Sequence, residues 1–364
     1  MTDTQPLVSI VIPAFNAEAT LADTVRSALA STYSSIEIII VDDGSTDGTA
    51  AIARSFAEQD QRVRVLGREN GGLSAALNTG FADALGDYVA RLDADDLWHP
   101  TKLERQMAVA AANPDAAFVY SFVRYIDADA RVLHDGPRQE FPPRALARGI
   151  YETIVGGGSS ALMKRSAIEE AGGCDESFRS LEDLLLQLKI SARHDAAFVP
   201  EYLVGYRVRA GSLTRDLDTM RATWDRLLET VRSLFPQVPS YLFDWADAAR
   251  SVGLAEDYAW AGRPLRSAEL LMRALRDDPA YVLRFLGYRS TRSVLRRFSG
   301  RRRRGPAPFF FDLDPAKPAS VDRFDIPPEG AAMIALRKRR AKDVAILDQK
   351  LRPGSAGRHG RDRR

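Results

Sequence analysis

The stretch Asp87-Tyr-Val-Ala-Arg-Leu-Asp-Ala-Asp-Asp96 places a carboxylate cluster directly after an apolar run that is typical of a buried strand. Carboxylates a few ångströms apart repel one another, so such a cluster is costly to assemble. A divalent cation such as Mg²⁺ or Mn²⁺ offsets that cost, because it prefers carboxylate oxygens and leaves coordination sites for phosphate. The alternative is a turn with a helix cap, in which Asp96 caps a helix ahead of Trp98-His99-Pro100. The stretch by itself favours neither interpretation.

Strand and helix patterns alternate along the sequence that precedes this cluster. Strands that alternate with helices predict βαβ units and a largely parallel sheet. We expect strands at residues 7–12 (ended by Pro13), 36–41, 62–66 and 87–92, and helices at 18–31, 47–58 and 72–85. Ligands bind beyond the carboxyl ends of such strands. Because Pro13-Ala-Phe-Asn16, Asp42-Asp43 and Asp93-Ala-Asp-Asp96 all fall at that edge, a binding site is favoured over a cap.

The rest of the chain is mixed at first, then helical, then basic. We expect strands at 117–120, 196–199 and 202–208, a hairpin at 127–136, and helices at 180–192, from about 216 to 299, and at 330–350. The fold class is therefore α/β, with a Rossmann-like, mostly parallel sheet flanked by helices and a C-terminal helical extension. The expected domains are 1–215, a helical region at 216–299, and a basic, partly disordered tail at 300–364.

Several protein classes are excluded by what the sequence lacks. No glycine follows the first strand in Ile12-Pro-Ala-Phe-Asn-Ala17 and no Walker-type loop is present, which argues against a dehydrogenase and a P-loop ATPase. No run approaches the roughly 18 apolar residues that span a bilayer, and residues 1–6 lack the pattern of a secretory signal. The single cysteine, Cys174, fits an apolar filler better than a catalytic thiol. We therefore expect a cytoplasmic protein.

The net charge of +2 hides an asymmetry between the two ends of the chain. Residues 292–364 hold 20 Lys and Arg against 8 Asp and Glu, so this part carries +12 and the rest of the chain −10. Each Arg near an anionic membrane contributes on the order of 1 kcal/mol, which predicts contact with the inner face of the cell membrane. A solvated charge run or a subunit contact is an equal alternative. No nucleic-acid-binding motif accompanies the charge, so no nucleic acid is expected.

Five motifs in one order resemble the family 2 glycosyltransferases of the GT-A fold. They are Val8-Ser-Ile-Val-Ile-Pro-Ala-Phe-Asn16, Val41-Asp-Asp-Gly-Ser-Thr-Asp47, Asn70-Gly-Gly-Leu-Ser74 with Asn78-Thr-Gly80, Leu92-Asp-Ala-Asp-Asp96, and Gly172-Gly-Cys-Asp-Glu-Ser-Phe178 with Leu181-Glu-Asp183. The resemblance covers residues 7 to about 215, which would be the catalytic domain. It implies an inverting transfer of a sugar from a nucleotide-diphosphate donor, usually a UDP-sugar, to an acceptor hydroxyl.

The resemblance implies a donor site at the same edge of the sheet. The residues implied for the nucleotide, its diphosphate and the metal are Pro13, Phe15, Glu18, Asp43, Asn70, Asp93, Asp95 and Arg209. Phe15 would stack on the nucleobase, a contact of roughly 1–3 kcal/mol, unless it is a core aromatic. Glu18 would lie near the ribose or cap the first helix, and Asp43 would accept a hydrogen bond from the uracil ring. Asp95, together with Asp93, would bind Mn²⁺ or Mg²⁺.

The resemblance also implies the groups on the acceptor side. Inversion in one step needs a base that takes the proton of the attacking hydroxyl. Asp183 matches the family's base, and Glu182 would orient the site or the acceptor. A helix N-terminus keeps two adjacent carboxylates ionised, although the pair would also suit a simple helix start. Gly156-Gly-Gly158 resembles the acceptor-side loop, for which we expect movement on binding.

The sequence departs from the family pattern at two positions. Arg209 stands where many relatives carry a metal- or diphosphate-binding His, so Arg207 or Arg209 is expected to supply charge to the diphosphate. Leu77 replaces an Arg that is frequent before the Asn of its helix. Asp42 and Asp47 are expected to be turn and cap residues rather than ligands.

The predicted function is the addition of a single sugar to a glycan or lipid-linked acceptor in surface polysaccharide biosynthesis. Processive relatives have transmembrane helices and a Gln-x-x-Arg-Trp motif, and this sequence has neither. A sugar-nucleotide pyrophosphorylase is disfavoured, because Pro13-Ala-Phe-Asn16 is not the Gly-rich loop such an enzyme needs. A catalytically degenerate nucleotide-sugar-binding scaffold remains the alternative.

Overall fold

The computed structural model describes residues 5–138, 143, 145–152, 158–208, 216–286, 307–319 and 331–351. The chain forms two compact units. The sheet unit comprises Met1–Arg144, Ile154–Ala210 and Ala307–Arg323, and the helical unit comprises Ala145–Thr153, Gly211–Pro306 and Phe324–Arg364. Among the described residues, no helix combines the length and the apolar character that crossing a bilayer requires.

The sheet unit is built on a mixed sheet with the strand order β3-β2-β1-β4-β8-β6-β9-β5, and β7 pairs with β6. The strands are β1 (Val8–Ala14), β2 (Ile36–Asp42), β3 (Val63–Gly67), β4 (Tyr88–Arg91), β5 (Leu97–Trp98), β6 (Ala116–Ile126), β7 (Val132–Asp135), β8 (Leu162–Lys164) and β9 (Asp195–Arg207). The first four strands are parallel, and β8 runs antiparallel to both β4 and β6. The predicted α/β fold with a mostly parallel first half is confirmed.

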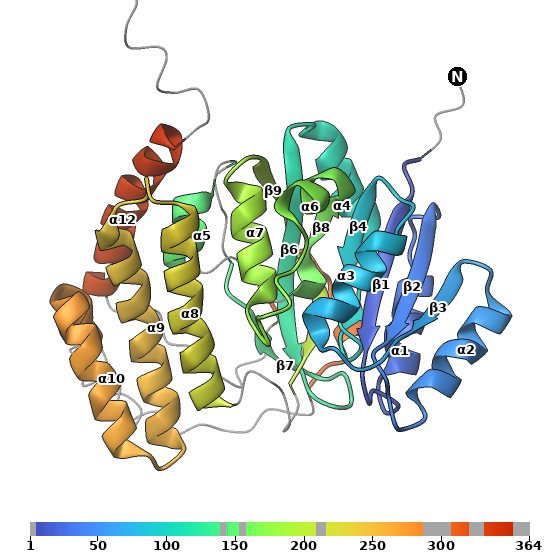
Figure 1. Cartoon of the computed structure of the whole chain (residues 1–364), viewed down its shortest axis with the longest axis horizontal. Helices are drawn as coiled ribbons and strands as arrows, with labels where there is room; N and C mark the ends of the chain where they lie inside the picture. Colours follow the sequence, from blue (N-terminus) through green and yellow to red (C-terminus); the bar gives the residue numbers. More distant parts are fainter. Residues whose placement is uncertain are drawn as a thin grey trace, which may run out of the picture. The chain divides into compact units, whose positions relative to one another are not determined.

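Helices cover both faces of this sheet. They are α1 (Leu21–Leu29), α2 (Thr49–Gln59), α3 (Leu73–Asp83), α4 (Lys102–Ala112), α6 (Arg165–Ala171) and α7 (Glu182–Ser191). The chain passes from β3 back across β2 and β1 to reach β4, and a right-handed crossover then places α3 on the face opposite α1. Figure 1 shows α3 and α7 on the near face of the sheet and α1 behind it. The helices and strands predicted before residue 92 are confirmed to within a few residues.

The prediction that Pro13 ends the first strand is wrong, since β1 continues to Ala14. The amide of Leu92 donates to the Val11 carbonyl, and that of Asp43 donates to the Ala14 carbonyl. Backbone groups of alternate residues therefore point to β4 and to β2, and the nitrogen of Pro13 points to the β4 side. The pairing of β1 with β4 ends at Val11. The N–H that proline lacks is not needed there.

The two strands predicted at 196–199 and 202–208 form the single strand β9. Its pairing with β6 shifts by two residues, from Ser121 opposite Val199 to Phe122 opposite Tyr202. Pro200 and Glu201 lie in that shift, so a bulge absorbs the proline and the strand continues. The predicted hairpin at 127–136 is confirmed by the antiparallel pairing of β6 with β7.

The helical unit contains α5 (Leu146–Glu152), α8 (Leu217–Leu234), α9 (Ser240–Trp260), α10 (Pro264–Asp277) and α12 (Ala331–Lys350). The helix predicted at 330–350 is confirmed as α12. A buried ion pair of 2.5 Å joins its Arg340 to Asp278, and the Arg340 guanidinium lies 4.1 Å from the ring centre of Trp245. These contacts hold α12 against the other helices of this unit. The last part of the predicted helical region, residues 287–299, lies outside the described residues.

A second polar contact at α12 depends on pH. The carboxylate of Asp348 is buried and accepts hydrogen bonds from the amides of Ala147 (2.7 Å) and Arg148 (3.3 Å). Burial raises the pKa of Asp348 to about 7, although these amides and the Arg148 charge oppose the rise. An unfolded Asp has a pKa near 3.9. Between these values the folded chain keeps a proton that the unfolded chain has released.

We predict that the free energy of unfolding falls in the wild type relative to Asp348→Asn as the pH rises from about 4 to 7. The folded state binds more protons in this range, so stability decreases with pH, whereas an amide cannot ionise. At 1.36 kcal/mol per pKa unit the relative loss is about 2–4 kcal/mol. Urea unfolding of both proteins at several pH values measures it. Parallel stability curves would contradict the prediction.

Two helical glycines predict opposite effects of the same substitution. In α3, a Cβ on Gly80 would overlap the Val11 side chain in β1, whereas nothing lies near a Cβ on Gly253 in α9. Gly80→Ala is therefore expected to lower the unfolding free energy by about 1–3 kcal/mol through overpacking. Gly253→Ala is expected to raise it by up to about 1 kcal/mol through helix propensity. Urea midpoints of the two variants measure the difference, and equal shifts would contradict it.

Candidate active site

The carboxyl ends of β1, β2, β3 and β4 meet at one edge of the sheet, as predicted from the sequence. Ala14 lies opposite Asp42, and Asp42 lies opposite Gly67. Phe15 follows a buried strand but is 51% exposed, so the alternative that it is a core aromatic is wrong. Asn16 next to it has φ +48°, a left-handed conformation that Asn tolerates better than most residues. This local turn directs the chain out of the sheet at Phe15.

Asp43 joins the end of β2 to the start of α3. Its side chain is buried, and its two carboxylate oxygens accept hydrogen bonds from the amides of Gly71 (3.0 Å) and Gly72 (2.8 Å). Arg68 Nε lies 3.3 Å from the same carboxylate. The exposed Asn70 is therefore held in a loop whose shape is set by Asp43. Of the two oxygens, Oδ1 faces both the Gly71 amide and Arg68, whereas Oδ2 accepts from the Gly72 amide and has a further lone pair for a ligand.

Glu18 and Asp47 serve the start of α2. Glu18 Oε2 accepts a hydrogen bond of 2.7 Å from the Gly48 amide, which lies at the start of α2. The alternative that Glu18 caps the first helix is therefore wrong. Asp47 accepts from both the amide and the hydroxyl of Thr49, and Asp42 accepts from the Ser45 amide. The predicted turn and cap roles of Asp42 and Asp47 are confirmed.

The alternative that Asp96 caps a helix is wrong. The helix α4 begins at Lys102 after Thr101, and the intervening residues Leu97–Trp98 form β5. Pairing of β5 with β9 brings Asp96 inside, where its Oδ1 accepts a hydrogen bond of 3.0 Å from the Arg207 amide. Asp96 is 1% exposed. Burial, followed by the charges of Asp95 and Asp93, raises its pKa well above the usual range.

The guanidinium of Arg207, one of the two residues expected near the diphosphate, bonds backbone carbonyls. It donates hydrogen bonds to the carbonyls of Asp95 (2.8 Å), Asp127 (3.2 Å) and Ala128. The side chain is buried, so it holds the loop after β4 to the β6–β7 turn. Arg209 lies outside the described residues.

Arg91 was not singled out from the sequence, yet it lies at the centre of the site. It ends β4, and its guanidinium donates to both oxygens of Asp93 (2.6 and 3.1 Å) and to Glu182 Oε1 (2.8 Å). Burial alone would lower the pKa of Arg91, but the carboxylates of Asp93, Glu182 and Asp183 outweigh it and raise the pKa. The available signal was an Arg within a strand of buried residues, because a buried charge must be paired.

The acidic pair Glu182-Asp183 begins α7. The preceding residue, Leu181, has φ +62°, an unusual conformation for a non-glycine residue that stores strain at the turn. Glu182 is buried against Arg91, and burial raises its pKa while Arg91 opposes the rise. Asp183 is partly exposed, and its Oδ1 accepts a hydrogen bond of 2.7 Å from the Leu184 amide. The two carboxylates thus have different surroundings, one buried and paired and the other open.

The segment Gly158–Ser160 packs against β4 and contacts the loop that follows it. Ser159 Oγ accepts a hydrogen bond of 3.0 Å from the Asp93 amide, and the Ser159 carbonyl accepts one of 2.8 Å from the indole of Trp98. All of its residues are buried. Gly156 and Gly157, the rest of the loop that was expected to move, lie outside the described residues. The predicted role of Cys174 as a filler is consistent with its burial, which raises its thiol pKa to about 12.

Two carboxylates at this edge, those of Asp93 and Asp95, could contribute ligands to a divalent cation. Among the described residues, no group of three or more His, Cys, Asp or Glu is arranged to hold a metal. Asp93 and Asp95 nevertheless present hard oxygen donors, and both are partly exposed. Mg²⁺ and similar ions commonly bind through one or two carboxylates together with substrate phosphates. The donor set therefore suits a cation that arrives with a diphosphate.

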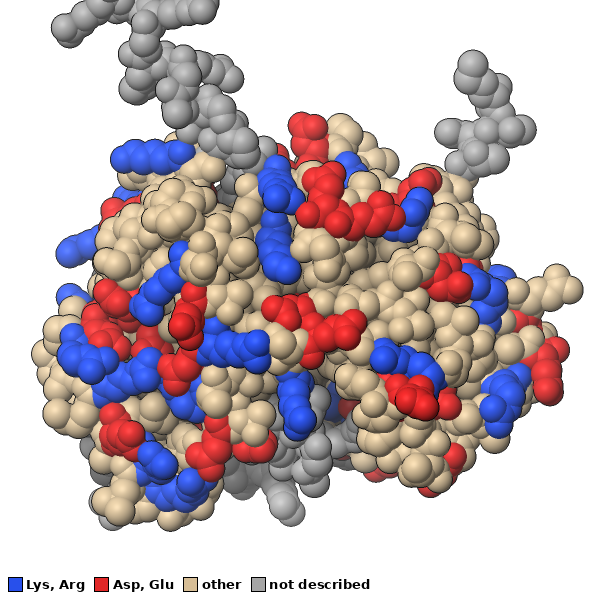
Figure 2. Space-filling model, in the orientation of Figure 1, with Lys and Arg blue, Asp and Glu red and all other residues tan. Residues whose placement is uncertain are grey.

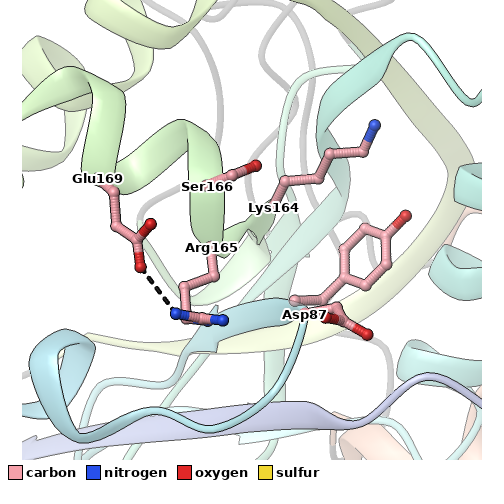
Figure 3. Close-up of a pocket in the computed structure, with 6 residues that line it drawn as sticks. Asp87, Lys164, Arg165, Ser166 and Glu169 are labelled. Carbon is pink, nitrogen blue, oxygen red and sulfur yellow. Dashed lines mark hydrogen bonds and ion pairs between the residues drawn. The ribbon is translucent and has the colours of Figure 1, made fainter.

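A cavity lies at the other end of β4 and is lined by none of the predicted site residues. It has a volume of about 220 Å³ and is lined by Asp87, Tyr88, Lys164, Arg165, Ser166 and Glu169. Figure 3 shows Arg165 turned toward Glu169, with a hydrogen bond of 2.8 Å between them. This cavity borders the amino end of β4, whereas the carboxylate cluster follows its carboxyl end.

Comparisons with known proteins agree with this fold. The model of the family described as "Glycosyl transferase family 2" matches residues 9–172. The putative teichuronic acid biosynthesis glycosyltransferase TuaG of Bacillus subtilis is 44% identical over 233 residues, which cover 62% of this chain and 88% of TuaG. The chain therefore belongs to glycosyl transferase family 2 and is a glycosyltransferase.

Two solved structures show the same GT-A fold. The S. aureus TarS fragment 1–349 in complex with UDP has a TM-score of 0.54 at 16% identity, covering 76% of this chain and 82% of TarS 1–349. The mannosyltransferase PcManGT of Pyrobaculum calidifontis, in complex with GDP-Man and Mn²⁺, has a TM-score of 0.52 at 18% identity, covering 80% of this chain and 81% of PcManGT. At these identities the likeness concerns the fold alone.

Proposed function

We propose that this glycosyltransferase is an inverting, metal-dependent enzyme that moves a single hexosyl group from a UDP-sugar to a hydroxyl of a glycan or lipid-linked acceptor in surface polysaccharide biosynthesis. The observation that carries the proposal is the junction of Asp93, Arg91 and Glu182, which joins the carboxylate cluster to the acidic start of α7. The similarity to TuaG, named for teichuronic acid biosynthesis, supports the class of product. The TarS complex with UDP supports the class of donor.

The donor nucleotide is proposed to lie across the ends of β1 and β2. The exposed ring of Phe15 offers a stacking surface for the base. The remaining lone pair of Asp43 Oδ2 is proposed to accept the uracil N–H. Asn70 and the backbone near Pro13 are proposed to border the nucleotide. Since Glu18 bonds the start of α2, its proposed contribution to the ribose side is to hold that turn.

The diphosphate is proposed to lie beside Asp93 and Asp95, with Arg209 as a further cationic contact. A Mn²⁺ or Mg²⁺ held by these two carboxylates would neutralise the negative charge that develops on the leaving diphosphate. The PcManGT complex with GDP-Man and Mn²⁺ supports such a cation in this fold. The buried Asp96 and Arg207 keep the loop in shape. Asp96 accepts a hydrogen bond from the Arg207 amide, and the Arg207 guanidinium donates to the Asp95 carbonyl and to the β6–β7 turn.

Asp183 is the proposed general base. As the acceptor oxygen attacks the anomeric carbon, its proton passes to the Asp183 carboxylate, and the bond from that carbon to the diphosphate oxygen breaks. The Leu184 amide fixes one oxygen of Asp183. Glu182 does not face the acceptor in this proposal, because its buried carboxylate is bound to Arg91. Its role is to orient the start of α7.

The test is release of the nucleoside diphosphate from a panel of UDP- and GDP-sugars, with Mn²⁺ and with a chelator. We expect metal-dependent release from a UDP-sugar, and a rate about 10²–10⁴ times lower for Asp183→Asn, since a general base contributes that factor. The matched control is Glu170→Gln, an exposed carboxylate paired with His194, which should retain the wild-type rate. UDP binding without turnover of any donor would instead favour the scaffold alternative.

A peripheral contact with an anionic membrane is proposed for the helical unit. Large apolar side chains are exposed near the end of α9 and along α10, namely Trp260 (77%), Leu265 (86%) and Met272 (65%). The basic run at 292–304, which lies outside the described residues, follows them in sequence. On the face seen in Figure 2, positive and negative side chains are interspersed, so the described surface there shows no large patch of one sign. Apolar insertion together with the basic run would supply the affinity.

Flotation with liposomes that contain anionic lipid tests this contact. We expect binding that falls as salt is raised, because the charges are screened, and that weakens at low salt in Trp260→Ser/Leu265→Ser. The control is Leu85→Ser, which changes a similarly exposed leucine (70%) of the sheet unit. Binding that is unaffected by both salt and the double substitution would contradict the proposal. Absence of binding would favour a solvated charge run or a subunit contact.

A further inference from the structure

Arg91 makes contacts on both sides of the proposed reaction centre. Its side chain is 7% exposed, and three of its donors are used on two carboxylates from different elements. Asp93 follows β4 and lies on the donor side, whereas Glu182 starts α7 beside the proposed base. These two residues are 89 positions apart in sequence and are joined through one guanidinium.

The position of this guanidinium is fixed from outside the ion pairs. A Cβ added to Gly158 would lie 2.5 Å from both Cζ and Nε of Arg91, so the side chain packs directly on the Gly158 backbone. The neighbouring Ser159 accepts the hydrogen bond of the Asp93 amide. One short segment therefore holds Arg91 and also the backbone of its partner. Movement of Arg91 away from one carboxylate is limited, and its charge is shared between the two.

We infer that Arg91 is a positioning residue that couples the donor side of the site to the start of α7. The inference rests on the proposed function and extends it. A cation and diphosphate that bind at Asp93 draw on the same carboxylate that Arg91 holds, so Arg91 then bonds more strongly to Glu182. Coupling of this kind is reciprocal. If nucleotide binding strengthens the pairing of Arg91 with Glu182, that pairing strengthens nucleotide binding by the same free energy, and a change at Glu182 alters the affinity.

A purely structural ion pair makes a different prediction, and the chain contains one for comparison. Arg64 in β3 also bridges two carboxylates, Glu37 (2.8 Å) and Asp83, at the amino end of β2 and the carboxyl end of α3. It is 38% exposed and touches none of the proposed site residues in these contacts. Arg64 therefore bridges two carboxylates as Arg91 does, but neither of them belongs to the proposed donor or acceptor side. Its conservative variant is the matched control.

The experiment is calorimetric binding of UDP with Mn²⁺ to the full chain and its variants. In Glu182→Gln the amide oxygen can still accept from Arg91, but the negative charge that competes with Asp93 for the guanidinium is gone. We therefore expect the affinity for UDP and Mn²⁺ to fall about fivefold or more, the lower end of common coupling energies. In Arg91→Gln, where Asp93 no longer competes with a guanidinium, we expect affinity at or above that of the wild type and a collapse of turnover. Adding Glu182→Gln to Arg91→Gln should change the affinity no further. Arg64→Lys should bind and turn over as the wild type does.

Two outcomes overturn the inference. Gln is nearly isosteric with Glu, so Glu182→Gln is expected to fold. Unchanged UDP affinity in this variant therefore means that the two sides are not coupled. An effect of Glu182→Gln that persists undiminished with Arg91→Gln means that Arg91 does not carry the coupling. If Arg91→Gln does not fold by circular dichroism, Arg91→Met, which also removes the positive charge, takes its place, and an undiminished effect there has the same meaning. Absence of UDP binding to the wild type overturns the proposed function itself.

Discussion

The candidate active site depends on the pairing of one buried cation, Arg91. Removing a guanidinium from water costs several kcal/mol unless it is paired and its donors are bonded. Arg91 meets this requirement only when the end of β4 and the start of α7 lie together, because Asp93 and Glu182 come from those two places. The same contact leaves two acidic groups with different surroundings. Asp183 remains partly exposed beside the buried Glu182.

Other buried polar groups shape the loops around this junction. Asp43 bonds two consecutive amides of the loop before α3, and Arg207 bonds carbonyls on both the loop after β4 and the β6–β7 turn. Each contact satisfies a backbone group that would otherwise be costly to bury. The loops at a ligand edge thereby obtain fixed shapes without regular secondary structure. A preorganised edge of this kind suits electrostatic stabilisation of a leaving group.

The helical unit is held by a similar principle with different chemistry. Arg340 of α12 combines a buried ion pair with a position over the Trp245 ring, and Asp348 of the same helix bonds the amides at the start of α5. Two polar contacts along one helix specify its register more sharply than apolar contacts alone.

The sequence by itself determined the alternation of strands and helices, the edge at which the motifs gather and the family, because these depend on local periodicity and on short motifs. It also placed Phe15, Asp43 and the cluster Asp93–Asp96 at that edge by their positions after strands. Only the tertiary structure decided which polar residues are buried and bonded to one another. Pairing of β5 with β9 buried Asp96, and contacts across some 90 positions made Arg91 a junction. Local patterns do not encode such contacts, since they arise when distant segments pack together.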